Sequence, residues 1–151
     1  MCCASPHYLA RHDAPQVPAD LAGHTCLTYA YLAQRDAWRF TDAKGGEHVV
    51  RVSGPAHANN GRFLAALAAE GAGIALEPDF IVGDHLATGR LVALLPGYQP
   101  PTSPIYAAYP SRRHLSAKVR AFVDFLAERF TGDAPWALGR PARKGWGARP
   151  R

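Results

Sequence analysis

The sequence lacks any hydrophobic run long enough to cross a membrane. Of its 151 residues 48% are hydrophobic, but Arg, His, Asp or Gly interrupts every apolar segment well before the roughly 20 residues that a spanning helix needs. The first six residues also lack the basic and apolar segments of a secretory signal. We therefore expect a soluble, cytoplasmic protein that does not bind a membrane and that has one compact core.

Cysteine is scarce, with three residues that are odd in number and have no regular spacing. This pattern argues against a disulfide scaffold, so we expect Cys2, Cys3 and Cys26 to be small apolar core residues. The histidines near them lack the paired spacing of zinc ligands. The sequence therefore predicts no metal site and no bound cofactor.

Positive charge is in excess only at one end of the chain. The net charge is +5, and residues 131–151 alone carry five basic residues and one acidic residue. The rest of the chain is nearly neutral, which argues against a broad basic face that docks on nucleic acid. Gly and Pro interleave with these basic residues and no hydrophobic period survives, so we expect residues 131–151 to form a disordered basic tail.

Catalytic motifs are missing as well. The chain has no Gly-x-Ser-x-Gly nucleophile elbow, the turn that exposes the serine of many hydrolases. Gly71-Ala72-Gly73 follows a predicted helix and precedes a predicted strand, which reverses the order of a dinucleotide-binding fingerprint. The sequence predicts no catalytic residue and a protein that is not an enzyme, while a Cys–His or Ser–His pair formed by folding stays an open alternative.

Two helices are predicted from their end signals. Ser5-Pro6 supplies an N-cap hydroxyl and a first-turn proline for a short helix that ends near Asp13. Asn59 or Asn60 starts a second helix, whose apolar residues recur at helical spacing up to Gly71, a C-cap glycine.

Strands are predicted between and after these helices. Residues 25–30 have the β-branched and aromatic content of a buried strand, and Pro15 and Pro18 predict an extended connection before it. Residues 38–40 and 48–52 alternate in polarity around a glycine-containing turn, which predicts a β-hairpin. Further strands are expected over residues 74–76, 91–95 and 105–109, and further helices over residues 79–86 and 117–130.

Four short patterns follow one another along the chain. They are Ser5-Pro6-His7-Tyr8-Leu9 continuing to Asp20-Leu21 and Cys26-Leu27, then Asn60-Gly61-Arg62 continuing to Gly71-Ala72-Gly73-Ile74-Ala75 and Pro78, then residues 86–92, and last Pro104-Ile105-Tyr106 with residues 116–126. In this order and at these spacings they resemble the second half of the effector-binding domain of LysR-type transcriptional regulators, over about residues 3–130. Two positions depart from the family pattern: Asp13 replaces a usual glycine, and Glu77 lies in a strand that is usually apolar.

The resemblance implies an α/β fold of the periplasmic-binding-protein type 2, in which two lobes close on a small ligand. Residues 3–78 would form the second lobe, and residues 79–130 the returning part of the first lobe. The opening part of the first lobe and the winged helix-turn-helix lie upstream in the family, so the chain is expected to be a truncated or mis-started reading of a longer regulator. The implied partners are a small-molecule effector, further copies of the full-length parent in a homo-oligomer, and DNA only through the missing N-terminal domain.

Five residues are predicted to line the cleft between the lobes. Open α/β sheets bind ligands at the carboxyl ends of strands and at helix starts, where backbone N–H groups favour anions. Ser5, Asn59 and Asn60 stand at the two predicted helix starts, and Thr28 and Tyr29 end a predicted strand that faces the same cleft. Plain capping is the alternative for Ser5 and Asn60, and burial in the core is the alternative for Tyr29.

The leading hypothesis is an effector-sensing module of a DNA-binding regulator, in which ligand binding shifts an equilibrium between open and closed lobes. The alternative is a solute-binding protein of a transporter, or an enzyme on the same two-lobed scaffold. A secretory signal would favour the transporter, and its absence favours the regulator.

Overall fold

The computed structural model describes residues 1–31, 36–102, 106, 108 and 116–130. The chain divides into two units, Met1–Thr102 and Ser103–Arg151, and each is described by itself. The strand predicted over residues 105–109 lies largely outside the described residues, and the tail predicted over residues 131–151 lies wholly outside them. Within the described residues, no helix is long and apolar enough to span a membrane.

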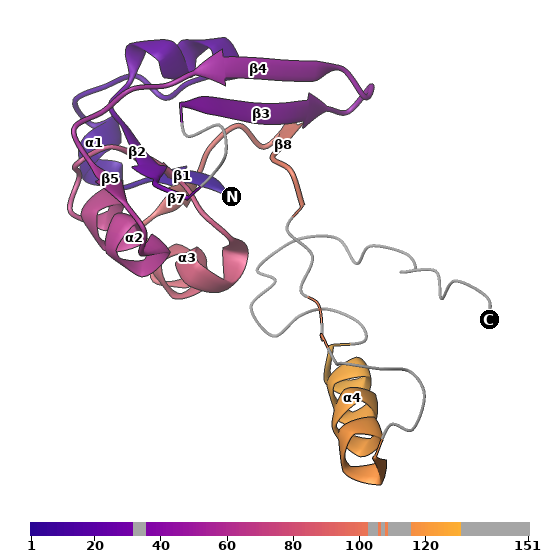
Figure 1. The fold of residues 1–151 in the computed structure, drawn as a ribbon. Coiled ribbons are helices and arrows are strands. Elements are labelled where there is room, and N and C mark those ends of the chain that lie inside the picture. Colours follow the sequence, from indigo (N-terminus) through magenta and orange to yellow (C-terminus); the bar gives the residue numbers. More distant parts are fainter. Residues whose placement is uncertain (32–35, 103–105, 107, 109–115, 131–151) are drawn as a thin grey trace. The chain divides into compact units, whose positions relative to one another are not determined.

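The first unit is built on a five-stranded sheet (Figure 1). In order across the sheet, the strands are β5 (His57–Ala58), β2 (Cys26–Tyr29), β6 (Ile74–Leu76), β1 (Cys2–Ala4) and β7 (Val92–Ala93). β2 runs parallel to β5 and β6, whereas β1 runs antiparallel to β6 and β7. The carboxyl end of β1 therefore lies at the edge of the sheet where the other strands begin.

Two helices, α2 (Gly61–Ala69) and α3 (Asp79–Ala87), cover one face of this sheet (Figure 1). α2 begins where the sequence predicts, because Asn60 caps its first turn. Gly71 follows its last turn with a φ of +85°, a left-handed conformation that glycine adopts without strain. The buried side chains on this face form one cluster of Cys3, Leu27, Leu64, Ala65, Ala68, Ala75, Val82 and Leu91.

The other face is covered by the predicted hairpin, β3 (Ala37–Asp42) and β4 (Glu47–Arg51), whose strands pair antiparallel. A short strand, β8 (Tyr98–Gln99), pairs with β3 on its other side. A second buried cluster joins the hairpin to the sheet and includes Cys2, Ala4, Cys26 and Ile74 from the sheet and Trp38, Phe40, Val50 and Val52 from the hairpin region.

Between β1 and β2 the chain forms two short helices, α1 (Pro6–Leu9) and the 3-10 helix η1 (Pro18–Gly23). α1 ends earlier than predicted. The extended connection predicted at Pro18 is wrong, because proline suits the first turn of a helix, where its missing N–H is not needed. Asp20 Oδ2 also stabilises this turn by accepting a 3.0 Å hydrogen bond from the Val17 amide.

The first compact unit extends beyond Pro78, the residue at which the sequence predicts a division between lobes. The predicted division follows Pro78, but α3 packs beside α2, and β7 pairs with β1 in the same sheet. The reason is that β6, α3 and β7 form a crossover that returns the chain to this sheet on the far side of β1. Residues up to Thr102 thus form one compact unit, and the assignment of segments to named lobes stays a prediction.

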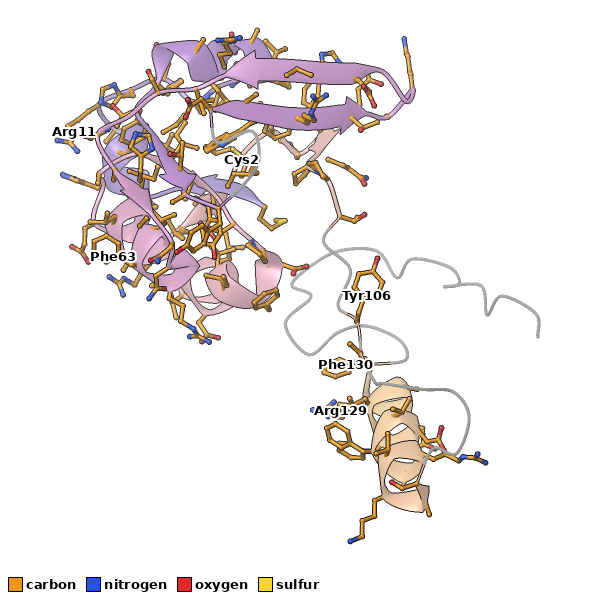
Figure 2. All side chains as sticks on the ribbon, in the orientation of Figure 1. Cys2, Arg11, Phe63, Tyr106, Arg129 and Phe130 are labelled. Atoms are coloured by element: carbon orange, nitrogen blue, oxygen red, sulfur yellow. The ribbon has the colours of Figure 1, made fainter. Side chains whose placement is uncertain are left out.

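The helix that the structure describes in the second unit is α4 (Ala117–Arg129), which confirms the prediction of a helix after Ser116. The Ser116 hydroxyl caps it by accepting a hydrogen bond from the Val119 amide at 3.4 Å. Its apolar side chains, including Phe122 and Phe125, are exposed, and Phe130 follows its last turn (Figure 2).

Candidate ligand-binding site

The carboxyl ends of three parallel strands meet at one edge of the five-stranded sheet. Thr28 of β2 pairs with His57 of β5, and Leu27 of β2 pairs with Ala75 of β6, so the three strands finish side by side. The start of α2 follows directly after β5. We name this region the carboxyl-end edge and define it by Tyr29, Asn59, Asn60 and Glu77.

Tyr29 and Asn59 contribute aromatic and amide groups to this edge. The half-buried Tyr29 ring lies edge-on to the exposed Tyr31 ring, with 6.1 Å between the ring centroids. Asn59 Nδ2 donates a hydrogen bond of 3.3 Å to the Tyr31 hydroxyl. The edge therefore presents π-systems and polar atoms in a small area.

Asn60 is the N-cap of α2, as predicted. Its Oδ1 accepts hydrogen bonds from the backbone amides of Arg62 at 3.0 Å and Phe63 at 3.3 Å. The capping interpretation is therefore confirmed, and a contact with a ligand stays a prediction. Phe63 projects outward from the same turn (Figure 2).

Thr28 belongs to the core of the first unit. Its side chain is fully buried, and its hydroxyl is hydrogen-bonded to His57 Nδ1. Since successive side chains of a strand point to opposite faces, Thr28 and Tyr29 lie on different sides of the sheet. Tyr29 is the residue of this pair that contributes to the carboxyl-end edge.

Ser5 lies apart from Tyr29, Asn59 and Asn60, and its predicted contact with a ligand stays a prediction. Because β1 is antiparallel to β6, Ser5 follows the end of β1 next to the start of β6. The level of Ser5 in the sheet is four residues before Tyr29 along β2. At about 3.3 Å per residue, this is a separation of roughly 13 Å along the strand direction. The Ser5 hydroxyl is buried and accepts a hydrogen bond from the Tyr8 amide at 3.1 Å, so it acts as a helix cap.

Glu77 is a site residue that the sequence prediction missed. It follows β6, and only 5% of its surface is exposed. Burial raises the pKa of its carboxyl to about 7, against a smaller lowering by the Met1 amino group. Its Oε1 has no hydrogen-bond partner among the described residues. The one signal in the sequence is a charged residue at the end of an apolar run.

The Glu77 carboxyl packs directly against the start of α2. A Cβ atom placed on Gly61 would lie 2.3 Å from Glu77 Oε2 and 2.8 Å from Ile81 Cδ1, so a larger residue at this position would displace these side-chain ends. Among the described residues, no group of three or more His, Cys, Asp or Glu side chains is arranged to hold a metal ion. The carboxyl-end edge thus offers aromatic rings, amides and one buried carboxyl.

Known proteins similar to this chain are transcriptional regulators and their regulatory domains. The HTH-type transcriptional regulator DmlR of Escherichia coli K12 is 37% identical over 137 residues, which is 88% of this chain and 43% of that protein. The HTH-type transcriptional regulator CrgA of Neisseria meningitidis serogroup C is 37% identical over 126 residues, which is 83% of this chain and 42% of that protein.

Solved structures of such regulators have the same fold. The full-length virulence activator AphB of Vibrio cholerae, a member of the LTTR protein family, matches with a TM-score of 0.74 and 30% identity over 85% of this chain and 43% of that chain. The CrgA regulatory domain from Neisseria meningitidis matches with a TM-score of 0.62 and 32% identity over 84% of this chain and 62% of that chain.

The chain spans less than half the length of the curated regulators it matches. Its α/β architecture is that of LysR-type regulatory domains, the periplasmic-binding-protein type 2-like fold predicted from the sequence. The family model for the LysR substrate binding domain matches residues 1–131, and the chain therefore belongs to the LysR substrate-binding domain family.

Proposed function

We propose that this chain is the effector-sensing portion of a LysR-type transcriptional regulator and that a small molecule binds at its carboxyl-end edge. The observation that carries the proposal is the family match, which extends over residues 1–131. Ligand sites of open α/β sheets lie outside the carboxyl ends of the strands. In the first unit, β2, β5 and β6 end at this edge.

The side chains at the edge suit a small organic ligand. Tyr29 offers apolar contact area with a polar tip, and Asn59 offers an amide that hydrogen-bonds in both directions. The exposed Asn59 side chain is held by its bond to the Tyr31 hydroxyl. Ligand binding would stabilise one conformation of the sensor relative to another, and this shift in populations would transmit the presence of the effector to the rest of the regulator.

We further propose that the rest of the regulator supplies DNA binding and that its copies form a homo-oligomer, whereas this portion has no catalytic role. The relatives described above are named as transcriptional regulators. Those names favour a regulator over the two alternatives, a solute-binding protein of a transporter and an enzyme on the same scaffold.

A thermal-shift screen of the purified chain against a library of small metabolites tests the proposal. A ligand at about 100 times its Kd stabilises a protein by about 2.7 kcal/mol, which is readily measured. We expect at least one compound to raise the melting temperature of the wild-type chain and to raise that of Asn59→Ala less. Lys44→Ala, in the turn between β3 and β4, is the matched control and should respond like the wild type.

Equal responses of the wild type, Asn59→Ala and Lys44→Ala to every stabilising compound would contradict the site. The Asn59 variant should fold normally without ligand, because exposed substitutions change stability by about 0.5 kcal/mol or less.

A further inference from the structure

Glu77 carries a buried carboxyl group whose Oε1 atom accepts no hydrogen bond from the described residues. Among the described residues it is the one buried carboxyl, and its Oε1 is shielded from water without a hydrogen-bond partner. Buried polar groups are hydrogen-bonded in nearly all native structures, so an exception requires an explanation. A ligand that donates a hydrogen bond to Oε1 supplies one.

The position for a negative charge at the start of α2 is already occupied. Asn60 Oδ1 accepts from two first-turn amides, and the Glu77 carboxyl packs against Gly61. Helix starts favour anions, and here the anion is the ionised form of Glu77. A negatively charged ligand at this place would add a second like charge, whereas a cation would neutralise the first.

The neighbouring strand β2 ends with an aromatic residue, Tyr29. Leu27 of β2 pairs with Ala75 of β6, and continuing this parallel register places Tyr29, the last residue of β2, level with Glu77, the first residue after β6. Neighbouring strands are about 4.8 Å apart. Aromatic faces attract ammonium and guanidinium groups, and a carboxylate forms charge-assisted hydrogen bonds with them.

We propose that the effector of this sensor carries a protonated amine that donates hydrogen bonds to the Glu77 carboxylate beside the ring of Tyr29. This inference rests on the proposed function and specifies the chemistry of its ligand. Because Oε1 is buried, the Glu77 side chain must move for the amine to reach it, and since Oε2 of the same carboxyl packs against Gly61, this movement couples binding to the start of α2.

Other ionisable groups act on Glu77 as well. They include the Met1 amino group, which lowers the pKa of its carboxyl, and the Cys3 thiol, whose own pKa the Glu77 charge raises. The Met1 amino group donates to the backbone carbonyl of Glu77 at 2.6 Å. Arg62 and Asp79 are the charged residues in the first turns of α2 and α3.

Titration calorimetry with three probes of the same shape tests the proposal: benzylamine, benzyl alcohol and benzoate. At pH 8 we expect the full wild-type chain to bind benzylamine at least about tenfold more tightly than benzyl alcohol, because only the amine forms a charge-assisted pair. Benzoate should bind weakest of the three. In Glu77→Gln the preference for benzylamine should vanish, while Glu70→Gln, an exposed residue paired with Arg90, should keep it.

The wild-type chain alone provides a second test. Benzylamine stays protonated from pH 6 to pH 8, so its affinity should rise about tenfold over this range as Glu77 ionises, and binding should release protons. The affinity of benzyl alcohol should change little. This test does not depend on the folding of any variant.

The proposal is overturned if benzylamine binds no more tightly than benzyl alcohol at pH 8, if it does not bind, or if Glu77→Gln retains the preference. Tighter binding of benzoate or benzyl alcohol, weakened by Asn59→Ala, would reject the amine and leave the proposed function standing. Failure of the proposed function is a separate result, in which no compound of the metabolite library distinguishes Asn59→Ala from Lys44→Ala.

Discussion

Replacing Glu77 by glutamine should change how the stability of the fold depends on pH. In the folded chain, burial raises the pKa of this carboxyl from 4.5 to about 7. The folded state therefore binds the proton more tightly than the unfolded state. Stability is lost as the pH rises from about 4.5 to about 7 and is constant above that range.

The size of this loss follows from the shift. One pKa unit corresponds to about 1.4 kcal/mol, so the raised pKa costs about 3 kcal/mol once the carboxyl is ionised. Glutamine has a similar shape and does not titrate. Between pH 5 and pH 8.5 the free energy of unfolding of the wild type should therefore fall by about 2–3 kcal/mol relative to that of Glu77→Gln.

Urea denaturation followed by far-UV circular dichroism at pH 5, 6, 7 and 8.5 measures this difference. The other titrating groups are common to both chains and cancel in the comparison. Glu70→Gln is the control and should follow the wild type, because Glu70 is exposed and forms a surface ion pair with Arg90 at 2.7 Å. A difference between the wild type and Glu77→Gln that is the same at pH 5 and pH 8.5 would show that the carboxyl is not held in a buried site.

Three variants and one thiol reagent further probe the first unit. Asn60→Ala should lower the free energy of unfolding by about 1 kcal/mol, as measured by urea titration. Asn60→Asp should lower it much less, because Asp also caps a helix. Gly71→Ala should cost about 1 kcal/mol or more in the same assay, since Gly71 has a φ of +85°. A thiol reagent such as DTNB should modify Cys2, Cys3 and Cys26 slowly in the native chain and rapidly in urea. The reason is that burial raises the pKa of each thiol in the folded chain. Rapid labelling of the native chain would contradict their burial.

The helices and the hairpin were predictable because their signals are local. A capping residue such as Asn60 and a glycine such as Gly71 mark the two ends of α2 within one short segment. The turn between β3 and β4 is similarly marked by glycines between alternating strands. Such signals act through neighbouring residues and do not depend on the rest of the fold.

The short strands and their directions were not predictable in this way. β1 and β5 have three and two residues, too few to show a period. That β1 runs against β6 is decided by tertiary pairing, and this direction moves Ser5 away from Asn60. The pairing of β7 with β1 is also tertiary, and it places β7 in the sheet of the first unit.

Glu77 shows what sequence reasoning supplied and what it missed at the site. Its departure from an apolar pattern was visible in the sequence. Its burial and its contact with Gly61 were not, because they require α2 to pack over the end of β6. The structure brings Tyr29, Asn59 and Asn60 to one edge of the sheet, and their contact with a ligand stays a prediction.

The most direct test of the central claim is to map a bound ligand by two-dimensional 1H–15N NMR of the 15N-labelled chain, titrated with benzylamine or with a compound from the metabolite screen. We expect the largest saturable shifts at the backbone amides of Tyr29, Asn59 and Gly61. Shifts concentrated at Ser5 and α1, or spread without saturation over the whole chain, would contradict a ligand site at the carboxyl-end edge.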